Sequence, residues 1–484
     1  MCAMVGSFLL YALVAATSVC SGNSNAAARP NVIFILADDW GWGDVGVYNP
    51  DHPFIRTPYL DVLASQGMLF TDFHVANPVC SPSRTAFMTG QFPSTLGIFN
   101  YLRSSHAANH GDGMPDFLNA STPTITRLLQ QAGYRTGHFG KWHLGSTPDA
   151  PPPTAYGINE SATYTSTDPN RLDGCADPGS IKVCPDVHWS GKSSGLIVDR
   201  GIEFIGNASK DQVPFYLNLW LHVSHAPLQL LPDQFAHYPL NRTCRLEDPD
   251  VYTHCPEQVF RAAQHDADAQ IGRLMSALDQ MKLVANTLVI FSADNGPEDP
   301  NIYFNSVGSA GPFRGQKRSI YEGGHRVPFI ARYPGVIPTN RTSHVLMSSV
   351  DFLPTIAAFT GTPLDSSVVG HLVGMDMTSV LKGGPAAERK VNLKWDWRFS
   401  VIGNCWNMAP RLAIRQGDWK LLMNADGSRV ELYNMTEVHF EDIDHSSRQP
   451  DVVKALSTEL LSWVATQPTG PVSAHPGCAM HVTP

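Results

Sequence analysis

The sequence is poor in charged residues, and no part of it is rich in basic ones. Asp, Glu, Lys and Arg make up 16% of the 484 residues, and the formal net charge is -9. Since nucleic-acid-binding proteins present clusters of Lys and Arg to the phosphate backbone, we expect no nucleic-acid partner. The chain also has no C-x-x-C pair and no phosphate-binding loop of the G-x-x-x-x-G-K type. Their absence argues against a thiol redox protein and a nucleotide-binding fold.

Hydrophobic runs long enough to cross a bilayer are also absent. The apolar run from Phe8 to Val19 is too short for a membrane span, and small residues follow it up to Ala28. This pattern predicts a signal peptide over residues 1–28, although no Lys or Arg precedes the run. A buried N-terminal helix is the alternative. We therefore expect no membrane span and a protein of the secretory pathway, either extracellular or lysosomal.

The asparagines and cysteines agree with export. Six N-x-S/T sequons begin at Asn119, Asn159, Asn207, Asn241, Asn340 and Asn434. Nine cysteines are present, of which Cys2 and Cys20 lie in the predicted signal peptide. In an oxidising compartment the remaining seven would pair and leave one thiol over. Weighting by loop closure, we predict the disulfides Cys175–Cys184, Cys244–Cys255 and Cys405–Cys478, which leaves Cys80 unpaired.

Short apolar runs alternate with helical patterns along most of the chain. The runs at residues 32–37, 215–223 and 287–292 have strand length and predict strands buried on both faces of a parallel sheet. Helical spacing of apolar residues predicts helices at residues 124–132, 258–281 and 350–359. This order indicates an α/β fold, in which a mixed, mostly parallel sheet is flanked by helices.

The pattern changes from about residue 363 onward. Segments 411–415 and 419–423 flank a short Gly-containing turn and predict a β-hairpin. A third short strand is predicted at residues 430–433 and a terminal helix at residues 451–463. We therefore predict a catalytic domain over residues 29–362 and a smaller C-terminal domain over residues 363–484, with an antiparallel sheet and a helix.

Polar residues lie at the end of each predicted strand. They are Asp38 and Asp39 for the first, His222 and His225 for the second, and Asp294 and Asn295 for the third. Because ligands bind beyond the carboxyl ends of strands in open α/β sheets, these distant residues can share one pocket. Carboxylate and amide oxygens suit calcium or magnesium rather than zinc. Turn residues are the alternative interpretation, since Asp and Asn favour turns.

The segment Cys80-Ser81-Pro82-Ser83-Arg84 places a thiol beside the signals of a helix start. Pro82 suits the first turn of a helix. Cys80 then lies at a helix N-terminus, where anions are favoured. Arg84 follows four residues later, so its side chain can lie on the same face of the helix.

With this C-x-P-x-R signature the chain resembles the type I, formylglycine-dependent sulfatases of the alkaline phosphatase superfamily. Segments 38–41 (DDWG), 140–145 (GKWHLG) and 315–329 (GQKRSIYEGGHRVPF) agree with it. The resemblance is strong over residues 31–360 and looser beyond them. Segments 41–44, 77–79 and 222–227 look most like the arylsulfatase A and N-acetylgalactosamine-6-sulfatase branch. The resemblance implies an alkaline-phosphatase-like catalytic domain.

The resemblance also implies the chemistry of Cys80 and of a metal ion. A formylglycine-generating enzyme would oxidise Cys80 to an aldehyde, whose hydrate attacks sulfur with one hydroxyl and expels sulfate with the other. One Ca²⁺ would be held by Asp38, Asp39, Asp294, Asn295 and the modified Cys80, and would lower the pKa of the attacking hydroxyl. The alternative for Cys80 is a disulfide partner or an inert buried thiol.

The same resemblance assigns the other catalytic residues. Arg84 matches the residue that holds the formylglycine, and His143 matches the base for sulfate release. Lys141 and Lys317 match lysines that bind sulfate, and His225 matches a histidine near the leaving-group oxygen. Lys141 and His143 are two positions apart, so on an extended segment their side chains would point the same way.

The implied activity is that of a sulfuric ester hydrolase acting on aryl sulfates or sulfated carbohydrates. The leading expectation is 6-sulfated N-acetylgalactosamine or galactose, with specificity set by residues 97–110 and 395–406. Trp395, Trp397 and Trp406 could stack on a sugar or pack within the small sheet. A phosphoester or phosphonate monoester hydrolase is one alternative. A non-catalytic glycan-binding relative is another, although every matched position is intact.

Overall fold

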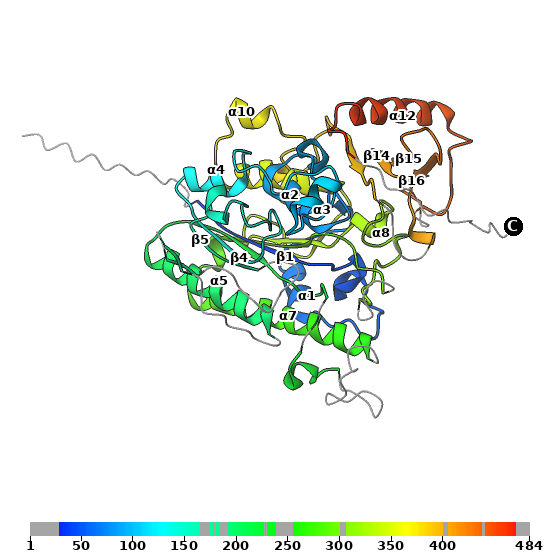
Figure 1. Cartoon of the computed structure of the whole chain (residues 1–484). Helices are drawn as coiled ribbons and strands as arrows, with labels where there is room; N and C mark the ends of the chain where they lie inside the picture. The colour runs from blue at the N-terminus through cyan, green and yellow to red at the C-terminus, as the bar shows by residue number, and fades with distance from the viewer. Residues whose placement is uncertain are drawn as a thin grey trace, which may run out of the picture.

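The computed structural model describes residues 29–164, 175–177, 180–182, 192–226, 228, 230–238, 255–300, 306–399, 405–437 and 441–470. An eight-stranded sheet in the order β11-β2-β10-β9-β1-β8-β4-β5 forms the main body. Figure 1 shows helices on both faces of this sheet and a second, smaller sheet beside it. The α/β prediction, with a separate C-terminal antiparallel sheet, is therefore confirmed.

The middle of the large sheet is parallel. Its parallel strands are β9 (Thr287–Ala293), β1 (Asn31–Ala37), β8 (Phe215–Trp220), β4 (Arg135–Lys141) and β5 (Glu160–Tyr164). β10 (Phe329–Arg332) runs antiparallel to β9 and to β2 (Met68–Phe70), whereas β11 (Arg341–Ser343) is parallel to β2. The three runs predicted as strands are strands, and the second ends at Trp220 rather than at residue 223.

Aromatic residues attach the helical layers to the sheet. α1 (Pro58–Ser65), α5 (Ser193–Lys210) and α7 (Pro256–Gln280) cover one face, and α2 (Cys80–Thr89), α4 (Ile125–Gln131) and α9 (Phe352–Thr360) cover the other (Figure 1). Phe34 of β1 packs against Phe87 of α2 and Phe352 of α9, with ring centroids 4.9 and 4.4 Å apart. On the opposite face, Phe139 of β4 meets Phe204 of α5 at 5.9 Å. Burial of such rings stabilises the layered arrangement.

Shorter elements connect these layers. They are α3 (His106–Gly111), α8 (Glu322–His325), α10 (Ser366–Val369), α11 (Thr378–Leu381), the paired strands β3 (Phe73–His74) and β12 (Met347–Ser348), and the hairpin of β6 (Cys175–Asp177) and β7 (Ser180–Lys182). Short 3-10 turns join several of the larger elements. Among the described helices, none combines the length and the apolar composition that a bilayer crossing requires.

The C-terminal sheet is a four-stranded antiparallel meander. Its strands are β13 (Leu393–Asp396), β14 (Leu412–Gln416), β15 (Trp419–Met423) and β16 (Glu431–Asn434). α12 (Pro450–Val464) buries Leu456 and Leu460 against the outer face of the sheet. The predicted hairpin, third strand and terminal helix are all present, whereas β13 was not predicted. The domain boundary at residue 362 stays a prediction.

Tryptophan side chains attach this small sheet to the rest of the protein. The indole Nε1 of Trp395 donates to the carbonyl oxygen of Val75 at 2.8 Å, and its ring lies 4.5 Å from that of His325. Trp395 and Trp397 are 1% and 2% exposed. These two tryptophans therefore pack within the structure and do not offer a face to a sugar.

A buried chain of hydrogen bonds crosses the same interface. His74 Nε2 lies 2.8 Å from Asp72 Oδ1, His74 Nδ1 lies 3.0 Å from His325 Nδ1, and His325 Nε2 lies 3.0 Å from Lys420 Nζ. His325 Nε2 also lies 3.2 Å from the carbonyl oxygen of Ile320, and Arg415 Nη1 lies 3.3 Å from His74 Nε2. Burial lowers the pKa of both histidines, in keeping with neutral rings.

Ion pairs surround this hydrogen-bonded chain. Lys420 Nζ on β15 lies 2.8 Å from Glu322 Oε1 and 2.7 Å from Glu441 Oε1. Arg415 Nη2 on β14 lies 2.9 Å from Asp72 Oδ2. The side chains of Lys420 and Glu322 are fully buried, so neither charge is stabilised by water. The small sheet thus supplies counter-ions for carboxylates that lie outside it.

Some expectations concern residues beyond those described. The predicted signal peptide lies there, and so do Cys184, Cys244 and Cys478, which leaves the three disulfide pairings as predictions. Cys80 is unpaired and buried, and Cys255 takes part in a disulfide.

We predict that Lys420→Met destabilises the protein strongly. The change leaves the buried carboxylates of Glu322 and Glu441 without their common counter-ion, which costs about 3 kcal/mol or more of the free energy of unfolding. Denaturant titration measures this loss. The matched control is Lys192→Met, which removes the ion pair between Lys192 and Asp233. The side chains of these two residues are 45% and 64% exposed. We expect a control effect below about 1 kcal/mol, and similar small effects for both variants would contradict the role of Lys420.

We also predict that Glu441 makes stability depend on pH. Burial raises its pKa from 4.5 to about 7, against the opposing effect of Lys420. Between these pH values the folded protein binds more protons than the unfolded chain, so its free energy of unfolding falls as pH rises. Thermal unfolding of wild type and Glu441→Gln across this range should show a weaker decline for the variant. Parallel curves would contradict the assignment.

Candidate active site

The candidate site lies where neighbouring parallel strands end. Ala37 pairs with Ala293 at the ends of β1 and β9, so the residues that follow, Asp38 and Asp294, lie side by side. The backbone N–H of Asp294 donates to the carbonyl oxygen of Ala37 at 3.1 Å. Lys141 ends β4, and His222 and His225 follow β8. The sheet topology therefore brings these predicted site residues together at the carboxyl ends of the strands.

Acidic side chains form the centre of this site. Asp38, Asp39, Cys80 and Asp294 each offer a ligand atom, and these atoms lie within 4.8 Å of one another. Asp39 has a φ of 62° in the left-handed region, where the strand geometry has ended. Consecutive side chains need not alternate there as they do within a strand, so both aspartates can reach the cluster.

Cys80 enters this cluster from the first residue of α2. Val79 is the N-cap, and Gly90 ends the helix with a φ of 67°. The Sγ atom lies 3.5 Å from Asp38 Oδ1 and 3.4 Å from Lys141 Nζ. Burial raises the pKa of the Cys80 thiol well above its ordinary value, against the opposing effects of Lys141 and Lys317. As an unmodified residue Cys80 is therefore a neutral thiol and a poor nucleophile.

Arg84 holds the carboxylate of Asp294 from the same helix. Its Nε and Nη2 atoms donate to Asp294 Oδ2 at 2.9 and 2.7 Å, and Nη1 donates to the carbonyl oxygen of Lys141 at 3.0 Å. The guanidinium also lies over the ring of Trp220, 5.1 Å from its centre. In this structure Arg84 therefore fixes the positions of β4 and β9 residues around Cys80.

Lys141 and His143 reach the site by different backbone conformations. Lys141 Nζ lies 2.5 Å from Asp38 Oδ2, and the Lys141 side chain is fully buried. His143 has a φ of 56°, so the segment is not extended as we expected. The left-handed turn, and not strand alternation, orients its ring. Burial lowers the pKa of His143 well below its ordinary value, and Lys141 and Arg84 lower it further. The imidazole is therefore neutral.

Lys317 approaches from the loop before α8. Its Nζ atom lies 2.6 and 2.8 Å from the two carboxylate oxygens of Asp39 and 3.4 Å from Glu298 Oε2. Burial raises the pKa of Asp39, and the charge of Lys317 lowers it. The combined effect holds the pKa of Asp39 below its ordinary value. The backbone N–H of Lys317 donates to the carbonyl oxygen of Pro297 at 2.9 Å. A loop that would otherwise be solvated is thereby attached to the segment after β9.

Glycine packing holds this loop close to Asn295. A Cβ atom on Gly296 would lie 1.9 Å from the carbonyl oxygen of Gly323, so only glycine fits there. The N–H of Gly296 donates to the carbonyl oxygen of Gly324 at 2.9 Å. The Asp294-Asn295 pair and the loop that carries Lys317 therefore form one unit.

The histidines after β8 complete the site. His225 Nδ1 lies 2.5 Å from the carbonyl oxygen of Ala226, which places its proton on Nδ1. Burial, Lys141 and Lys317 lower the pKa of His225 well below its ordinary value, so the ring is neutral. Ligand atoms of His222, His225 and Asp38 lie within 4.8 Å of one another.

The donor atoms of this cluster are suited to a metal ion. Asn295 Nδ2 donates to Asp39 Oδ1 at 2.7 Å, so the Oδ1 atom of Asn295 points away from that bond. The Oδ1 atom of Asn295 is buried and has no hydrogen-bond partner. An unsatisfied buried oxygen beside three carboxylates matches a cation that prefers oxygen ligands. The cluster can therefore hold a metal ion.

Two residues beside the site, one acidic and one aromatic, were not predicted from the sequence. Glu298 is 2% exposed and contacts both Lys317 and Arg318. The only sequence feature that could have indicated Glu298 is its position four residues after Asp294. Its contact with Lys317 is seen only in the structure. Tyr164 ends β5, and burial raises the pKa of its phenol well above its ordinary value, with a further contribution from Asp38. Neither residue stands in a recognisable motif.

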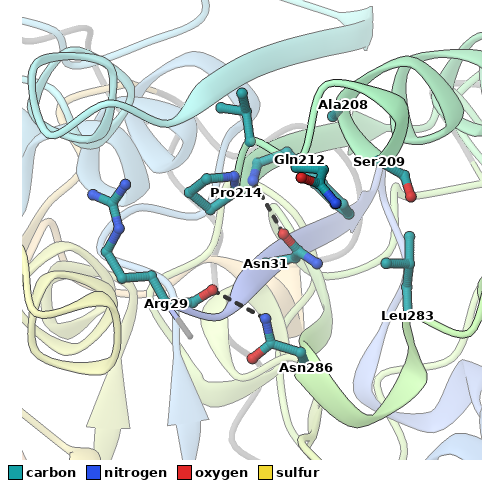
Figure 2. Close-up of a pocket in the computed structure, with 10 residues that line it drawn as sticks. Arg29, Asn31, Ala208, Ser209, Gln212, Pro214, Leu283 and Asn286 are labelled. Carbon is teal, nitrogen blue, oxygen red and sulfur yellow. Dashed lines mark hydrogen bonds between the residues drawn. The ribbon is translucent and has the colours of Figure 1, made fainter. Parts of the chain in front are cut away.

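A separate pocket of about 330 Å³ lies at the amino ends of the central strands, beside the first residues of β1 and β8. Figure 2 shows Arg29, Asn31 and Asn286 around it, with Asn286 Nδ2 donating to the Arg29 carbonyl oxygen at 3.1 Å. Asn31 begins β1, and Asn286 precedes β9. Ligands of parallel sheets bind at the carboxyl ends of strands, so the cluster at that end, and not this pocket, is the candidate active site.

The buried cluster is a candidate metal site at the strand ends of an α/β fold, and comparison with known proteins gives the family. The sulfatase family model matches residues 30–362. N-acetylgalactosamine-6-sulfatase of Canis lupus familiaris is 32% identical over 391 residues, which cover 76% of this chain and 69% of that protein. Arylsulfatase A of Homo sapiens is 33% identical over 404 residues, covering 79% and 72%. The chain belongs to the sulfatase family and is a sulfuric ester hydrolase.

Solved structures show the same fold. The complex of Ps i-CgsB with a neocarrahexaose superposes with a TM-score of 0.74 at 24% identity, covering 92% of this chain and 95% of that one. The phosphonate monoester hydrolase of Agrobacterium radiobacter superposes with a TM-score of 0.61 at 20% identity, covering 90% and 96%. The alkaline-phosphatase-like prediction for the catalytic part is thus confirmed.

Proposed function

We propose that this sulfatase removes sulfate from sugars, with 6-sulfated N-acetylgalactosamine or galactose as the leading substrate, after Cys80 has become formylglycine. The observation that carries the proposal is the position of Cys80. It is a neutral, buried thiol at a helix N-terminus, 3.4 Å from Lys141 Nζ and 3.5 Å from an Asp38 oxygen. Such a thiol is a poor nucleophile, whereas a hydrated aldehyde would present a hydroxyl at the same place.

Asp38, Asp39, Asp294, Asn295 and the modified residue 80 would hold a single Ca²⁺. The orphaned oxygen of Asn295 and the three clustered carboxylates support this assignment. When bound, the ion would polarise a sulfate oxygen and lower the pKa of the attacking hydroxyl. The ammonium groups of Lys141 and Lys317, which are the counter-ions of Asp38 and Asp39 in this structure, could then bind sulfate.

The neutral histidines fit the remaining roles. An uncharged His143 ring could accept the proton whose removal accompanies sulfate release, and the negative charge of a bound sulfate would raise its lowered pKa toward the range that a general base needs. His225 would lie near the leaving-group oxygen. Arg84 would keep Asp294 and the Lys141 backbone in place around residue 80. Buried cations around a dianionic substrate supply the charge stabilisation that the reaction needs.

The relatives support a sugar substrate. One similar protein is named for N-acetylgalactosamine 6-sulfate, and a solved structure of the same fold contains D-glucosamine-2-N,6-O-disulfate as its substrate. A phosphoester is the competing substrate class, because a phosphonate monoester hydrolase shares the fold.

We further propose that the protein is exported and glycosylated, to the lysosome or the exterior. The side chains of Asn119, Asn159 and Asn340 are exposed, and Asn207 and Asn434 are partly exposed. All five are therefore accessible to some degree, while Asn241 lies outside the described residues. Conversion of Cys80 would use the formylglycine-generating enzyme of that route.

Conversion of Cys80 is the first test. Peptide mass mapping of protein made in a host that contains the converting enzyme should show an aldehyde at position 80. Cys80→Ala should lose aryl sulfate turnover and keep its melting temperature, because the side chain contributes little packing volume. Fully active protein in which Cys80 is still alkylated by iodoacetamide would refute the conversion.

Metal binding is tested without relying on turnover. Adding CaCl₂ to chelator-treated protein should raise the melting temperature, since a ligand at 100 times its dissociation constant stabilises by about 2.7 kcal/mol. Asp39→Asn should weaken this shift, whereas the surface variant Asp233→Asn should retain it. Elemental analysis should give one equivalent of calcium. Two equivalents of zinc would favour the phosphatase-like chemistry instead.

The substrate is tested by comparing rates on 6-sulfated and 4-sulfated N-acetylgalactosamine, with an aryl sulfate and an aryl phosphate as references. We expect the 6-sulfated sugar to be cleaved faster than the 4-sulfated one, and the aryl sulfate faster than the aryl phosphate. Good aryl sulfate turnover without activity on either sugar would reduce the activity to that of a general arylsulfatase. A faster rate on the phosphate would favour the phosphoester alternative.

A further inference from the structure

A group of histidine and aspartate side chains lies on and around α3, outside the catalytic cluster. His106 and His110 belong to α3, Asp116 follows this helix, and Asp149 comes from the segment after β4. Side chains four positions apart on a helix lie on the same face, one turn from each other. The ring centroids of the two histidines are accordingly 6.3 Å apart.

Both imidazoles approach the same carboxylate oxygen. His106 Nδ1 lies 2.9 Å and His110 Nε2 lies 3.0 Å from Asp116 Oδ2. A zinc ion binds imidazole nitrogen and carboxylate oxygen at about 2.0–2.2 Å, so it would take the place of the protons that now join these three atoms. The two histidine side chains are 49% and 64% exposed, which leaves their rings room to turn toward a common ion.

The second nitrogen of His106 has the partner that a metal-binding histidine needs. Histidines that bind a metal usually donate their other ring N–H to a carboxylate or a carbonyl oxygen. His106 Nε2 lies 3.5 Å from Asp149 Oδ1. With Nδ1 bound to a metal, His106 would carry its proton on Nε2, where the Asp149 carboxylate can accept it.

Asn109 fixes the orientation of the Asp116 carboxylate. Its side chain is buried, and its Nδ2 atom donates to Asp116 Oδ1 at 3.0 Å and to the carbonyl oxygen of Arg103 at 2.9 Å. Its Oδ1 atom accepts from the N–H of Arg103 at 2.8 Å. Asp116 Oδ2 is therefore held toward the two histidines before an ion binds, which lowers the entropic cost of binding.

The donor set of this group differs from that of the catalytic cluster. The catalytic cluster offers carboxylate and amide oxygens, which suit calcium, whereas α3 offers two imidazole nitrogens, which suit zinc and other transition metals. In the part of the chain that the structure describes, the ion-pair partners of Asp116 are His106 and His110. This carboxylate thus lacks a permanently charged Lys or Arg partner among those residues.

The segment before α3 lies against the catalytic site. The backbone N–H of Leu102 donates to Ser81 Oγ at 2.9 Å, next to Cys80. The ring of Tyr101 lies 6.4 Å from that of His143. An ion that joins α3 to Asp116 would therefore restrict the motion of a loop in contact with catalytic residues.

We propose that His106, His110 and Asp116 form a second metal site, which binds one Zn²⁺ ion and leaves a fourth position to water. Asp149 orients His106 as an acceptor of its Nε2 proton. The ion takes no part in sulfate removal, and it ties α3 to the residues that follow this helix. This site is independent of the proposed sugar substrate and of the calcium site.

The test is calorimetric titration of ZnCl₂ into calcium-saturated protein that has been freed of transition metals. We expect one zinc ion per chain for the wild type. The double variant His106→Gln and His110→Gln loses two of three ligands, so its zinc affinity should fall at least about a hundredfold. Asp149→Ala should weaken zinc binding about tenfold, as loss of a partner of a metal-binding histidine does. Because the Asp149 side chain is 62% exposed, this variant should keep the melting temperature of the zinc-free wild type.

A matched control removes a second pair of neighbouring histidines. The ring centroids of His237 and His265 are 4.4 Å apart, and His265 Nδ1 lies 3.0 Å from the carbonyl oxygen of Arg56. The double variant His237→Gln and His265→Gln should bind zinc as the wild type does. Loss of zinc binding in this control would place the ion there and overturn the proposed site.

Hydrogen exchange locates the ion without measuring turnover. Zinc should slow amide exchange over residues 103–116 in the wild type and leave it unchanged in the His106→Gln and His110→Gln variant. Equal zinc affinity in the wild type and this variant overturns the site. Zinc that remains bound to this variant but is lost from Asp39→Asn lies in the catalytic cluster, which overturns the proposal as well. Unchanged affinity in Asp149→Ala would overturn the role of Asp149.

Discussion

The balance between three buried carboxylates and three buried cations organises the catalytic end of this protein. The carboxylates are Asp38, Asp39 and Asp294, and the cations are Arg84, Lys141 and Lys317. None of the carboxylates is more than 2% exposed, so each needs a counter-ion inside the protein. The cations come from α2, from the end of β4 and from the loop before α8. The site therefore exists only when these separate elements have packed together.

The C-terminal sheet contributes to the same arrangement from behind. Lys420 on β15 binds Glu322, which begins α8, and α8 follows directly after the loop that carries Lys317. Glu441 accepts a hydrogen bond from the backbone N–H of Glu322 at 2.7 Å. The small sheet and the segment after it thus fix the part of the chain that places a lysine beside Asp39.

Much of the fold was predictable because its signals are local. The apolar runs of β1 and β9 are continuous, and Thr124, the first residue of the predicted helix, caps α4 by accepting from the N–H of Arg127. The helix start at Cys80 was also read correctly. The expected extended path from Lys141 to His143 was wrong, because His143 turns into the left-handed region. That turn depends on burial against distant elements, which a local pattern does not contain.

The sequence by itself determined the types of chemistry available. A C-x-P-x-R motif, paired aspartates and an Asp-Asn pair after apolar runs supplied the thiol and the candidate metal ligands. The tertiary structure decided which residues meet. Only packing shows that Glu298 supports Lys317, that the buried chain of hydrogen bonds from Asp72 to Lys420 reaches the small sheet, and that Trp406 is exposed while Trp395 is buried. The physical reason is that burial and charge pairing depend on contacts between residues far apart in the chain, whereas motif and periodicity report only on neighbours.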